Sequence, residues 1–581
     1  MLMFERQRFT ARIRVEDKNN PPSPPLRAMA FIKGEMGGFP RKKESGYLNR
    51  KKIAQLIIAR LDGKDIDKKF RYYQSLVKKG IGGFIIFGGK LKEVSRAIKR
   101  LQNYTEIPLF IASDLEQGLG QHVEGGTLFP PAMAIGQAIN QKNKNDISLL
   151  RKSISIIARE AKAAGINTIF SPVLDVNTNP KNPIICTRAF SDSPKKVAWF
   201  GSEFIKGFQK HGIIACAKHF PGHGDTIKDS HKELPVVKAD IKRLWDIELY
   251  PFSQAVKAGV KMIMIGHLKV PALDSKFPST LSQKIMQGLL RERMRFKGLV
   301  ITDAMNMHAI KLGEEKACLT ALNAGADIIL HPSNPEKIID YLSSRWDEIM
   351  PMVEESFQRI VKVKSEINSV QRTAYSVQRI GAKAHWETAK ELTQKSIKII
   401  PKNKTSLFCH AELDSASKET LKQACPEEIL NRVQNDTFRV QGDTFKVFSK
   451  QIVVLIIDDD NNNSGKPFIN ALKKRYKKIK SFYVDNKTPL YPPLVRGELK
   501  GGGKPLIIAV FSKISAWKGR SGLSSKLKTI LEKSVRASGY SVIAGFCCPY
   551  SLSDIKADAV INAYSGSKLA QEAAAKILCG P

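Results

Sequence analysis

The chain has 581 residues, of which 42% are hydrophobic and 26% are charged. These proportions are typical of a folded globular protein, and the length is sufficient for more than one domain. The formal net charge of +39 at pH 7 raises the question of a polyanionic partner. Because the lysines are scattered and no nucleic-acid-binding motif accompanies them, we expect no nucleic-acid partner.

The spacing of the cysteines and the composition of the first residues give a prediction of the cellular compartment. The eight cysteines form no C-x-x-C pair and have no regular spacing, so we expect reduced thiols in a cytosolic protein. Residues 1–16 lack the apolar core of a secretory signal peptide, and no apolar stretch reaches transmembrane length. These features predict a cytoplasmic protein without a membrane partner.

The N-terminal part of the chain divides into a leader and a regular region. Residues 1–46 are predicted to be a disordered leader, because 17–46 is rich in Pro, Gly and charge and has no periodicity. In 47–365, apolar β-type runs alternate with helix-period segments. The runs are 53–58, 81–87, 107–112, 168–173, 213–217, 261–265, 298–301 and 327–330. This alternation predicts an α/β fold, a (β/α)8 TIM-like barrel, although the first run could equally be helical.

A barrel places its catalytic groups directly after its strands, at their carboxyl ends. Five of the expected strands end in this way. The polar residues that follow them are Asp114, Asp175, Lys218 with His219, His267 and Asp303. We therefore predict that the active site lies at this end of a catalytic barrel.

The remaining residues are predicted to form a helical linker, 366–400, and a smaller C-terminal α/β sandwich domain, 401–581. Apolar runs at 452–457, 506–510 and 540–546 alternate there with helix-period segments. We find no cluster of ionisable residues at these strand ends and assign the domain no catalytic role. Two segments near 409–438 and 488–504 interrupt the pattern, and we interpret them as repeat-derived surface insertions.

The densest group of ionisable residues lies in 216–235, C-A-K-H-F-P-G-H-G-D-T-I-K-D-S-H-K-E-L-P. Asp229 and His231 are two residues apart, so an extended backbone would point both to one side and let the carboxylate orient the imidazole. Asp303 could be a nucleophile or the N-cap of the next helix. A nucleophilic Asp facing an acid/base dyad is the minimum for retaining hydrolysis at an acetal carbon through a covalent glycosyl-enzyme.

Two other classes of function stay open on the residues alone. The same histidines and aspartates could ligate zinc or a two-metal centre, as in barrel metallohydrolases. The neighbouring Lys218 weakens that alternative, because a cation beside a metal site opposes metal binding, and we predict no metal and no cofactor. A degenerate, non-catalytic sugar-binding protein is the other alternative.

Several motifs resemble glycoside hydrolase family 3, in its β-N-acetylglucosaminidase branch. K-H-F-P-G-H-G-D-T-I-K-D-S-H-K-E-L-P at 218–235 resembles the family signature, and V-I-T-D-A-M-N-M at 300–307 resembles its nucleophile strand. The similarity covers about residues 48–365 and part of the C-terminal domain. It implies a carbohydrate partner and retaining removal of non-reducing terminal β-linked N-acetylglucosamine from peptidoglycan-derived muropeptides.

By position, the resemblance implies roles for eight residues. Asp303 would be the nucleophile, His231 the acid/base and Asp229 its partner. The residues that would bind the sugar are Asp114, His122, Arg188, Lys218 and His219. Glu116, Asp175 and His267 are expected to hold loops, and His308 and His331 to cap or pack.

One departure from the family pattern concerns the sugar site. The family pattern D-x-E-G-G-R-V-x-R begins at the position of Asp114, but Leu119 and His122 replace its two arginines. An imidazole has fewer donors than a guanidinium and is usually neutral, so we expect weaker or altered sugar binding. An imidazole acid/base would not repel phosphate as a carboxylate would, which leaves a phosphorylase as an alternative.

Overall fold

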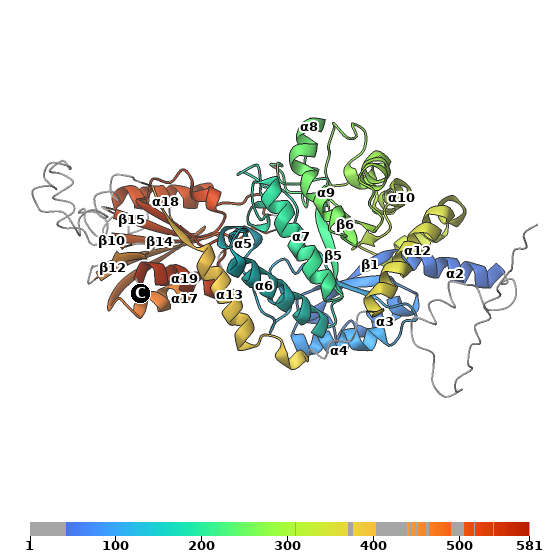
Figure 1. Ribbon diagram of the computed structural model, residues 1–581, viewed down its shortest axis with the longest axis horizontal. Helices are drawn as coiled ribbons and strands as arrows, with labels where there is room; N and C mark the ends of the chain where they lie inside the picture. The colour runs from blue at the N-terminus through green and yellow to red at the C-terminus, as the bar shows by residue number, and fades with distance from the viewer. Residues whose placement is uncertain are drawn as a thin grey trace, which may run out of the picture.

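The computed structural model describes residues 42–307, 309–369, 376–402, 438–441, 444–447, 451–460, 464–489, 505–515, 518–538 and 540–579. His308 and nearly all of the two expected insertions lie outside the described residues, as does most of the expected leader. Helix α2 (Lys42–Gln55) begins four residues before the expected end of that leader, at 46. Figure 1 shows a barrel of blue, green and yellow elements, with the orange and red C-terminal elements on its left.

Eight parallel strands form the barrel sheet, in the order β7-β6-β5-β4-β3-β2-β1-β8. The strands are β1 (Ile57–Asp62), β2 (Gly83–Phe87), β3 (Phe110–Ser113), β4 (Thr168–Ile169), β5 (Ile214–Phe220), β6 (Met262–Ile265), β7 (Leu299–Thr302) and β8 (Ile329–Leu330). A parallel bridge between Ile301 and Ile328 joins the two edges of this sheet. The predicted TIM-like barrel is confirmed.

Helices cover the outside of the barrel. They are α2, α3 (Phe70–Lys78), α4 (Leu91–Gln102), α5 (Ala132–Ala138), α6 (Lys144–Ala163), α7 (Pro194–Lys210), α8 (Ile241–Arg243), α9 (Tyr250–Lys257), α10 (Glu314–Ala324), α11 (Pro335–Ser343) and α12 (Trp346–Ser369), with the π-helical η4 (Leu244–Glu248) and η6 (Lys284–Arg293). The side chain of Asn143 accepts hydrogen bonds from the amides of Asn145 and Asp146, which fixes the start of α6. Buried residues such as Leu150, Ile154 and Ile157 then form the face that α6 turns to the barrel.

The run 53–58, which the sequence left between helix and strand, is divided between the two. Helix α2 ends at Gln55, and β1 begins at Ile57. Ile53 and Ile58 are both fully buried, so the run is apolar on either side of the boundary. Hydrophobic periodicity over so short a run cannot separate the two structures.

The C-terminal domain is an α/β sandwich around a six-stranded sheet in the order β13-β12-β14-β15-β16-β9. Its strands are β9 (Lys398–Pro401), β12 (Gln451–Asp458), β13 (Lys478–Asp485), β14 (Pro505–Phe511), β15 (Tyr540–Phe546) and β16 (Ala559–Asn562), and its helices are α17 (Lys466–Lys473), α18 (Ser525–Ala537) and α19 (Lys568–Cys579). A separate antiparallel pair consists of β10 (Phe438–Gln441) and β11 (Thr444–Val447). Alternate residues of β12 pack on opposite faces: Val454 lies in the core with α17 and α19, and Leu455 lies in the core with α18.

Two features join the barrel to the C-terminal domain. Helix α13 (Lys383–Ser396) lies between them (Figure 1), and its His385 donates from Nδ1 to the buried carboxylate of Glu160 on α6, at 2.6 Å. A disulfide joins Cys186, in a loop of the barrel, to Cys548, just after β15. The prediction that all cysteines are reduced is therefore wrong for this pair. The two cysteines are 362 residues apart, so no local spacing could have indicated it.

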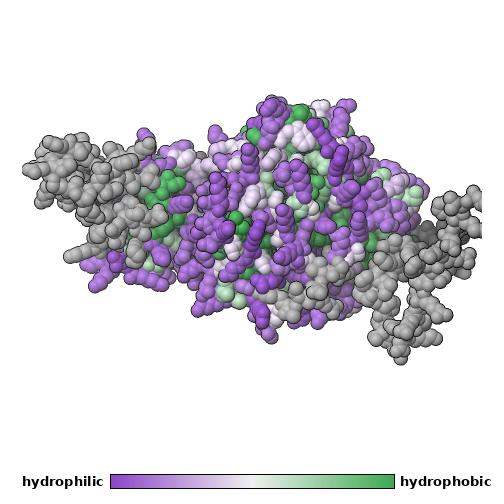
Figure 2. All heavy atoms as spheres, in the orientation of Figure 1, coloured by the Kyte–Doolittle hydropathy of each residue, from purple (hydrophilic) through white to green (hydrophobic). Residues whose placement is uncertain are grey.

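The surface agrees with a folded protein in water. Figure 2 shows a face covered mostly by hydrophilic residues, with apolar residues in small separate areas. Within the described ranges, none of the helices has the length and apolar character needed to cross a membrane.

Reduction of the Cys186–Cys548 disulfide is expected to lower the free energy of unfolding by about 2–4 kcal/mol, because it releases a long loop in the unfolded chain. Urea unfolding followed by tryptophan fluorescence, with and without reductant, measures the difference. In a Cys548→Ser variant the reductant should have no effect. Superimposable curves for the wild-type chain under both conditions would contradict the prediction.

Candidate active site

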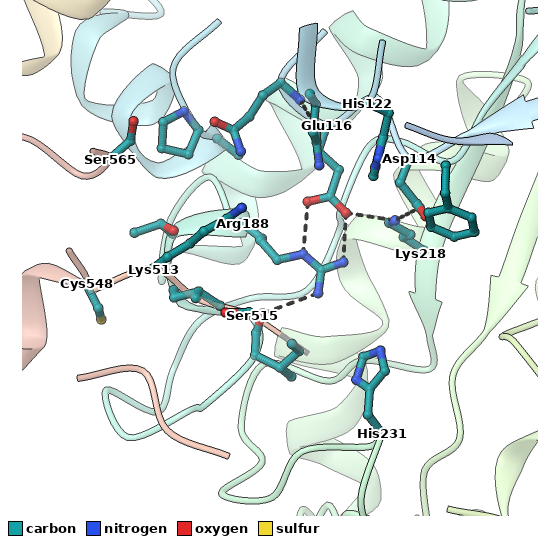
Figure 3. Close-up of a pocket in the computed structure, with 18 of the residues that line it drawn as sticks. Asp114, Glu116, His122, Arg188, Lys218, His231, Lys513, Ser515, Cys548 and Ser565 are labelled. Atoms are coloured by element: carbon teal, nitrogen blue, oxygen red, sulfur yellow. Dashed lines mark hydrogen bonds and ion pairs between the residues drawn. The ribbon is translucent and has the colours of Figure 1, made fainter. Parts of the chain in front are cut away.

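A cavity of about 760 Å³ opens at the carboxyl ends of the barrel strands. The barrel contributes one wall, which includes Asp114, Lys218, His231 and Asp303. The C-terminal domain contributes the other wall, which includes Lys513. Figure 3 shows side chains from both parts of the chain pointing into this space. The structure thus brings Asp114, Lys218, His219 and Asp303 to one cavity. Asp175 and His267 do not line it: both are fully buried, where they contact His219 and the carbonyl of Ala304.

Four charged side chains that line the cavity form a network. Glu116 accepts two hydrogen bonds from Arg188, Nε to Oε2 at 2.9 Å and Nη2 to Oε1 at 2.7 Å. Lys218 Nζ lies 2.7 Å from Glu116 Oε1 and 2.6 Å from Asp114 Oδ1 (Figure 3). Burial would raise the pKa of Glu116, but Arg188 and Lys218 hold it well below its usual range. Glu116 therefore holds the two cations in place, as expected of a loop-holding group.

Asp175 holds two histidines, His219 near the end of β5 and His223 in the loop that follows. Its carboxylate is fully buried, accepts from His219 Nδ1 at 2.7 Å, and accepts from the backbone amide of His223 at 2.6 Å. The other nitrogen of His219, Nε2, then lies 3.5 Å from Arg188 Nη2. Burial lowers the pKa of His223 to about 4, so this imidazole is neutral near pH 7.

The loop after β5 follows a path that requires glycine. Gly222 has φ +131°, in the region that side chains rarely adopt. A Cβ on Gly224 would lie 1.8 Å from the carbonyl oxygen of Val176, so only glycine allows this close approach. The two glycines bring the loop back over the barrel and toward the D-S-H segment.

Asp303 follows β7 and lines the cavity. The amide of Ala304 donates to its Oδ1 at 2.8 Å. Burial would raise the pKa of this carboxyl, but nearby imidazoles, foremost His219 and His267, hold it at about 2. The side chain is thus an ionised carboxylate near neutral pH. The next helix, α10, begins at Glu314 after an N-cap at Gly313, so Asp303 does not cap it.

Asp229 and His231 have the geometry that the D-x-H spacing predicts. His231 Nδ1 lies 2.8 Å from Asp229 Oδ1, and the backbone amide of His231 donates to the same oxygen at 3.0 Å. The Asp229 carboxylate is almost completely buried, whereas the imidazole is about one quarter exposed and lines the cavity. The carboxylate selects the tautomer of His231 with the proton on Nδ1, so the imidazole is oriented by Asp229 where it lines the cavity.

The two departures from the arginine pattern lie in different places. Leu119 is fully buried in the core, and His122 lines the cavity with its ring edge-on to Phe87, at 5.5 Å between ring centres. Burial lowers the pKa of His122, so it offers a neutral imidazole. His331 packs near Phe87, at 6.0 Å between ring centres, and it also lines the cavity, with φ +47°.

Sequence reasoning missed the second wall of the cavity. An ionisable cluster does lie at the strand ends of the C-terminal domain, contrary to our expectation. Asp459, directly after β12, accepts from Arg520 Nη2 at 3.0 Å and lies 2.9 Å from Lys518 Nζ. The neighbouring Asp460 accepts from the backbone amide of Lys513 at 2.6 Å. The three consecutive aspartates at 458–460, directly after an apolar run, are the signal that could have revealed it.

The histidines and carboxylates of the cavity bind to one another rather than converge on a shared point. Among the described residues, no group of three or more His, Cys, Asp and Glu side chains is placed to hold a metal ion. The arrangement is that of a carboxylate and an oriented imidazole facing a solvent-accessible cavity. Such a pair can supply a nucleophile and a proton donor.

Comparison of the sequence with known proteins identifies a family model and several similar proteins. The glycosyl hydrolase family 3 N-terminal domain model matches residues 48–363. A β-hexosaminidase A from Pseudoalteromonas piscicida is 33% identical over 323 residues, which are 49% of this chain and 54% of that protein. A β-hexosaminidase from Methylobacillus flagellatus is 31% identical over 277 residues, which are 46% of this chain and 78% of that protein. This chain therefore matches only about half of the length of the Pseudoalteromonas relative.

A solved structure extends the likeness to the C-terminal domain. The structure of a glycoside hydrolase family 3 β-N-acetylglucosaminidase from Paenibacillus sp. is similar to this one with a TM-score of 0.72 at 25% identity. The likeness covers 91% of this chain and 96% of that chain. The barrel and the C-terminal domain thus occur together in that structure as well.

The buried, neutral His223 is expected to make stability depend on pH. Its pKa is about 4 in the folded chain and about 6.5 when unfolded, so below pH 6.5 the unfolded state binds more protons. The contribution to the free energy of unfolding is therefore lost as the pH falls from about 6.5 to about 4, by about 3 kcal/mol in total. Urea unfolding at pH 7, 6, 5 and 4 should show a shallower decline for His223→Gln than for the wild type. Parallel declines would contradict this assignment.

Proposed function

The chain belongs to glycosyl hydrolase family 3, and we propose that it is a retaining β-N-acetylhexosaminidase that removes non-reducing terminal N-acetylglucosamine. The observation that carries the proposal is the ionised Asp303 in one cavity with His231, whose imidazole is held by Asp229. The names of the similar proteins, β-hexosaminidase and β-N-acetylglucosaminidase, support the choice of sugar.

In the first step, Asp303 is the nucleophile and His231 the acid. Asp303 Oδ2 attacks the anomeric carbon, because Oδ1 is already held by the amide of Ala304. The bond between the anomeric carbon and the leaving-group oxygen breaks as His231 Nε2 gives that oxygen its proton. Asp229 stabilises the imidazolium that donates the proton. The products are the free alcohol and a sugar bound covalently to Asp303.

In the second step, His231 changes from acid to base. It takes a proton from water at Nε2, and the water oxygen attacks the anomeric carbon and displaces Asp303. The carboxylate and the protonated imidazole are thereby restored. Two displacements at the same carbon retain its configuration.

The remaining predicted residues are proposed to bind the sugar. Asp114 contacts Lys218 through Oδ1 and lines the cavity, and Lys218, Arg188 and His219 place nitrogen atoms on the same side of it. Carboxylate and cationic groups of this kind form hydrogen bonds with pairs of sugar hydroxyls. His122 adds a neutral imidazole, a weaker partner than the arginine of the family pattern.

For the natural substrate, we propose N-acetylglucosaminides derived from peptidoglycan, which the D-S-H loop supports through its resemblance to family members. A cytoplasmic location stays a prediction. The Cys186–Cys548 disulfide counts against it, because cytosolic reductants keep most thiols reduced.

Replacement of Asp303 tests the nucleophile. Asp303→Ala is expected to bring hydrolysis of a chromogenic β-N-acetylglucosaminide down by a factor on the order of 10⁴ or more, the range seen when a covalent nucleophile is removed. The wild-type rate should be unchanged by a chelator and by added inorganic phosphate. Loss of the wild-type rate with chelator would overturn the covalent mechanism, and a requirement for phosphate would identify a phosphorylase.

Replacement of His231 tests the acid. His231→Gln is expected to slow the cleavage of an alkyl glycoside by about 10²–10⁴-fold, because a poor leaving group needs the proton. Bond cleavage in a dinitrophenyl glycoside, measured as the burst of released phenol, should slow far less, because that leaving group departs without a proton. His211→Gln, a half-buried histidine outside the cavity, is the matched control and should leave both rates intact. Equal losses on the two substrates would exclude His231 as the acid.

A further inference from the structure

We propose that Lys513 forms a leaving-group subsite that selects substrates whose aglycone carries a carboxylate. This inference rests on the proposed function, since it names the class of leaving group that the same cavity accepts. It assigns a role in recognition to the C-terminal domain, which contributes Lys513 in the loop after β14.

The charge balance of the cavity sets Lys513 apart. Four cationic side chains line the cavity: Arg60, Arg188, Lys218 and Lys513. The first three have carboxylate partners, which are Asp62 for Arg60, Glu116 for Arg188, and Asp114 with Glu116 for Lys218. The ammonium group of Lys513 has no carboxylate partner within the described parts of the chain. It is the cation of this cavity that remains available to an anionic ligand.

The backbone that carries Lys513 is fixed by other contacts. Its amide donates to Asp460 Oδ2 at 2.6 Å, and its carbonyl accepts from Lys518 Nζ at 3.0 Å. Lys518 in turn contacts the buried Asp459 at 2.9 Å. The adjacent Ile514 packs against the apolar cluster of the barrel loop that includes Ile185. The lysine therefore projects from a built wall rather than from a loose surface loop.

The position of this wall corresponds to the leaving group. The residues proposed to bind the sugar and Asp303 line the barrel side of the cavity, and the C-terminal domain lines the other side, which we assign to the aglycone. In Figure 3, Lys513 extends into the cavity beside Arg188. Its charge contributes to the lowered pKa of His122, after the larger effect of burial. Lys513 is thus within electrostatic range of the sugar site.

The acid/base loop lies next to the same wall. The side chain of Lys232, the residue after His231, lies against Gly519, with its Nζ 3.1 Å from where a Cβ would be. Since His231 is proposed to protonate the leaving-group oxygen, the aglycone leaves beside this contact. Lys232 adds a second positive charge at that edge, and Ser515 on the same wall offers a hydroxyl donor. An ammonium and a hydroxyl together suit a carboxylate.

The test compares two aglycones of nearly equal shape. The substrates are the 3-carboxyphenyl and 3-carbamoylphenyl β-N-acetylglucosaminides, of which only the first is anionic. The ratio of their kcat/KM values is measured for the wild type, Lys513→Gln and Lys513→Glu. The matched control is Lys556→Gln, an exposed lysine of the same domain outside the cavity.

Lys513→Gln is expected to lower the preference for the carboxylated substrate by about 5-fold, the upper end for a solvent-accessible ion pair. Lys513→Glu should lower it further, and added salt should lower it in the wild type but not in Lys513→Gln. Lys556→Gln should keep the wild-type ratio. An unchanged ratio in Lys513→Gln would overturn the proposal.

Failure of the proposed function gives a different result. If the wild type hydrolyses neither glycoside, the glycosidase assignment fails, and calorimetric titration of the same two compounds then tests the subsite. A carboxylate preference in binding that is present in the wild type and lost in Lys513→Gln supports the subsite. Equal affinities for the two compounds in the wild type, or a preference that survives in Lys513→Gln, would overturn it.

Discussion

Glu116 accepts hydrogen bonds from Arg188 and lies 2.7 Å from Lys218, in a place where its side chain is only 9% exposed. Removing one partner from such a network leaves a buried charge without compensation, which typically costs about 3–5 kcal/mol. Glu116 follows β3, Arg188 lies in the loop after β4, and Lys218 lies in β5, so their contacts fix these two loops relative to the barrel sheet. The positions of the charged groups on the barrel side of the cavity depend on this constraint.

The network also divides the cavity into two kinds of surface. On the barrel side, Arg188 and Lys218 are paired with Glu116 and Asp114, and these ion pairs fix the orientation of the four side chains. On the side of the C-terminal domain, Asp459 and Lys518 are paired behind the wall, and Lys513 stands in front of it. Paired charges on one wall beside a cationic group on the other suit the proposed roles, in which a sugar ring is held at one end and the group attached to it is discriminated at the other.

The barrel could be predicted because buried parallel strands are continuous apolar runs, as at 213–217 and 298–301. Strand β15 (Tyr540–Phe546) has the boundaries that its run predicts. Polar residues at the run ends, such as Asp303, predicted the barrel side of the site, because all parallel strands point the same way. The run 53–58 shows the limit, since a helix and a strand that are both buried have the same composition.

The rest of the site depends on contacts between distant parts of the chain. Lys513 looks like any solvated lysine in the sequence, and only the packing of Ile514 against the barrel brings it to the cavity. The disulfide could not be predicted either, because Cys186 and Cys548 come together only through the packing of the two domains. The three aspartates at 458–460 directly after an apolar run could indicate a cluster of charged residues at a strand end. The sequence does not show which cations pair with them, because Lys518 and Arg520 are about sixty residues further along the chain.

The separation of Cys186 and Cys548 has a consequence for synthesis on the ribosome. Domains generally fold as units from the N-terminus while the chain grows at about 5–20 residues per second. Cys548 follows Cys186 by 362 residues, which take roughly 20–70 s to make, and during that time Cys186 is a thiol without its partner. The nascent barrel can therefore be folded long before the C-terminal domain is complete. A chain that stops before Cys548 would leave Cys186 without its disulfide partner.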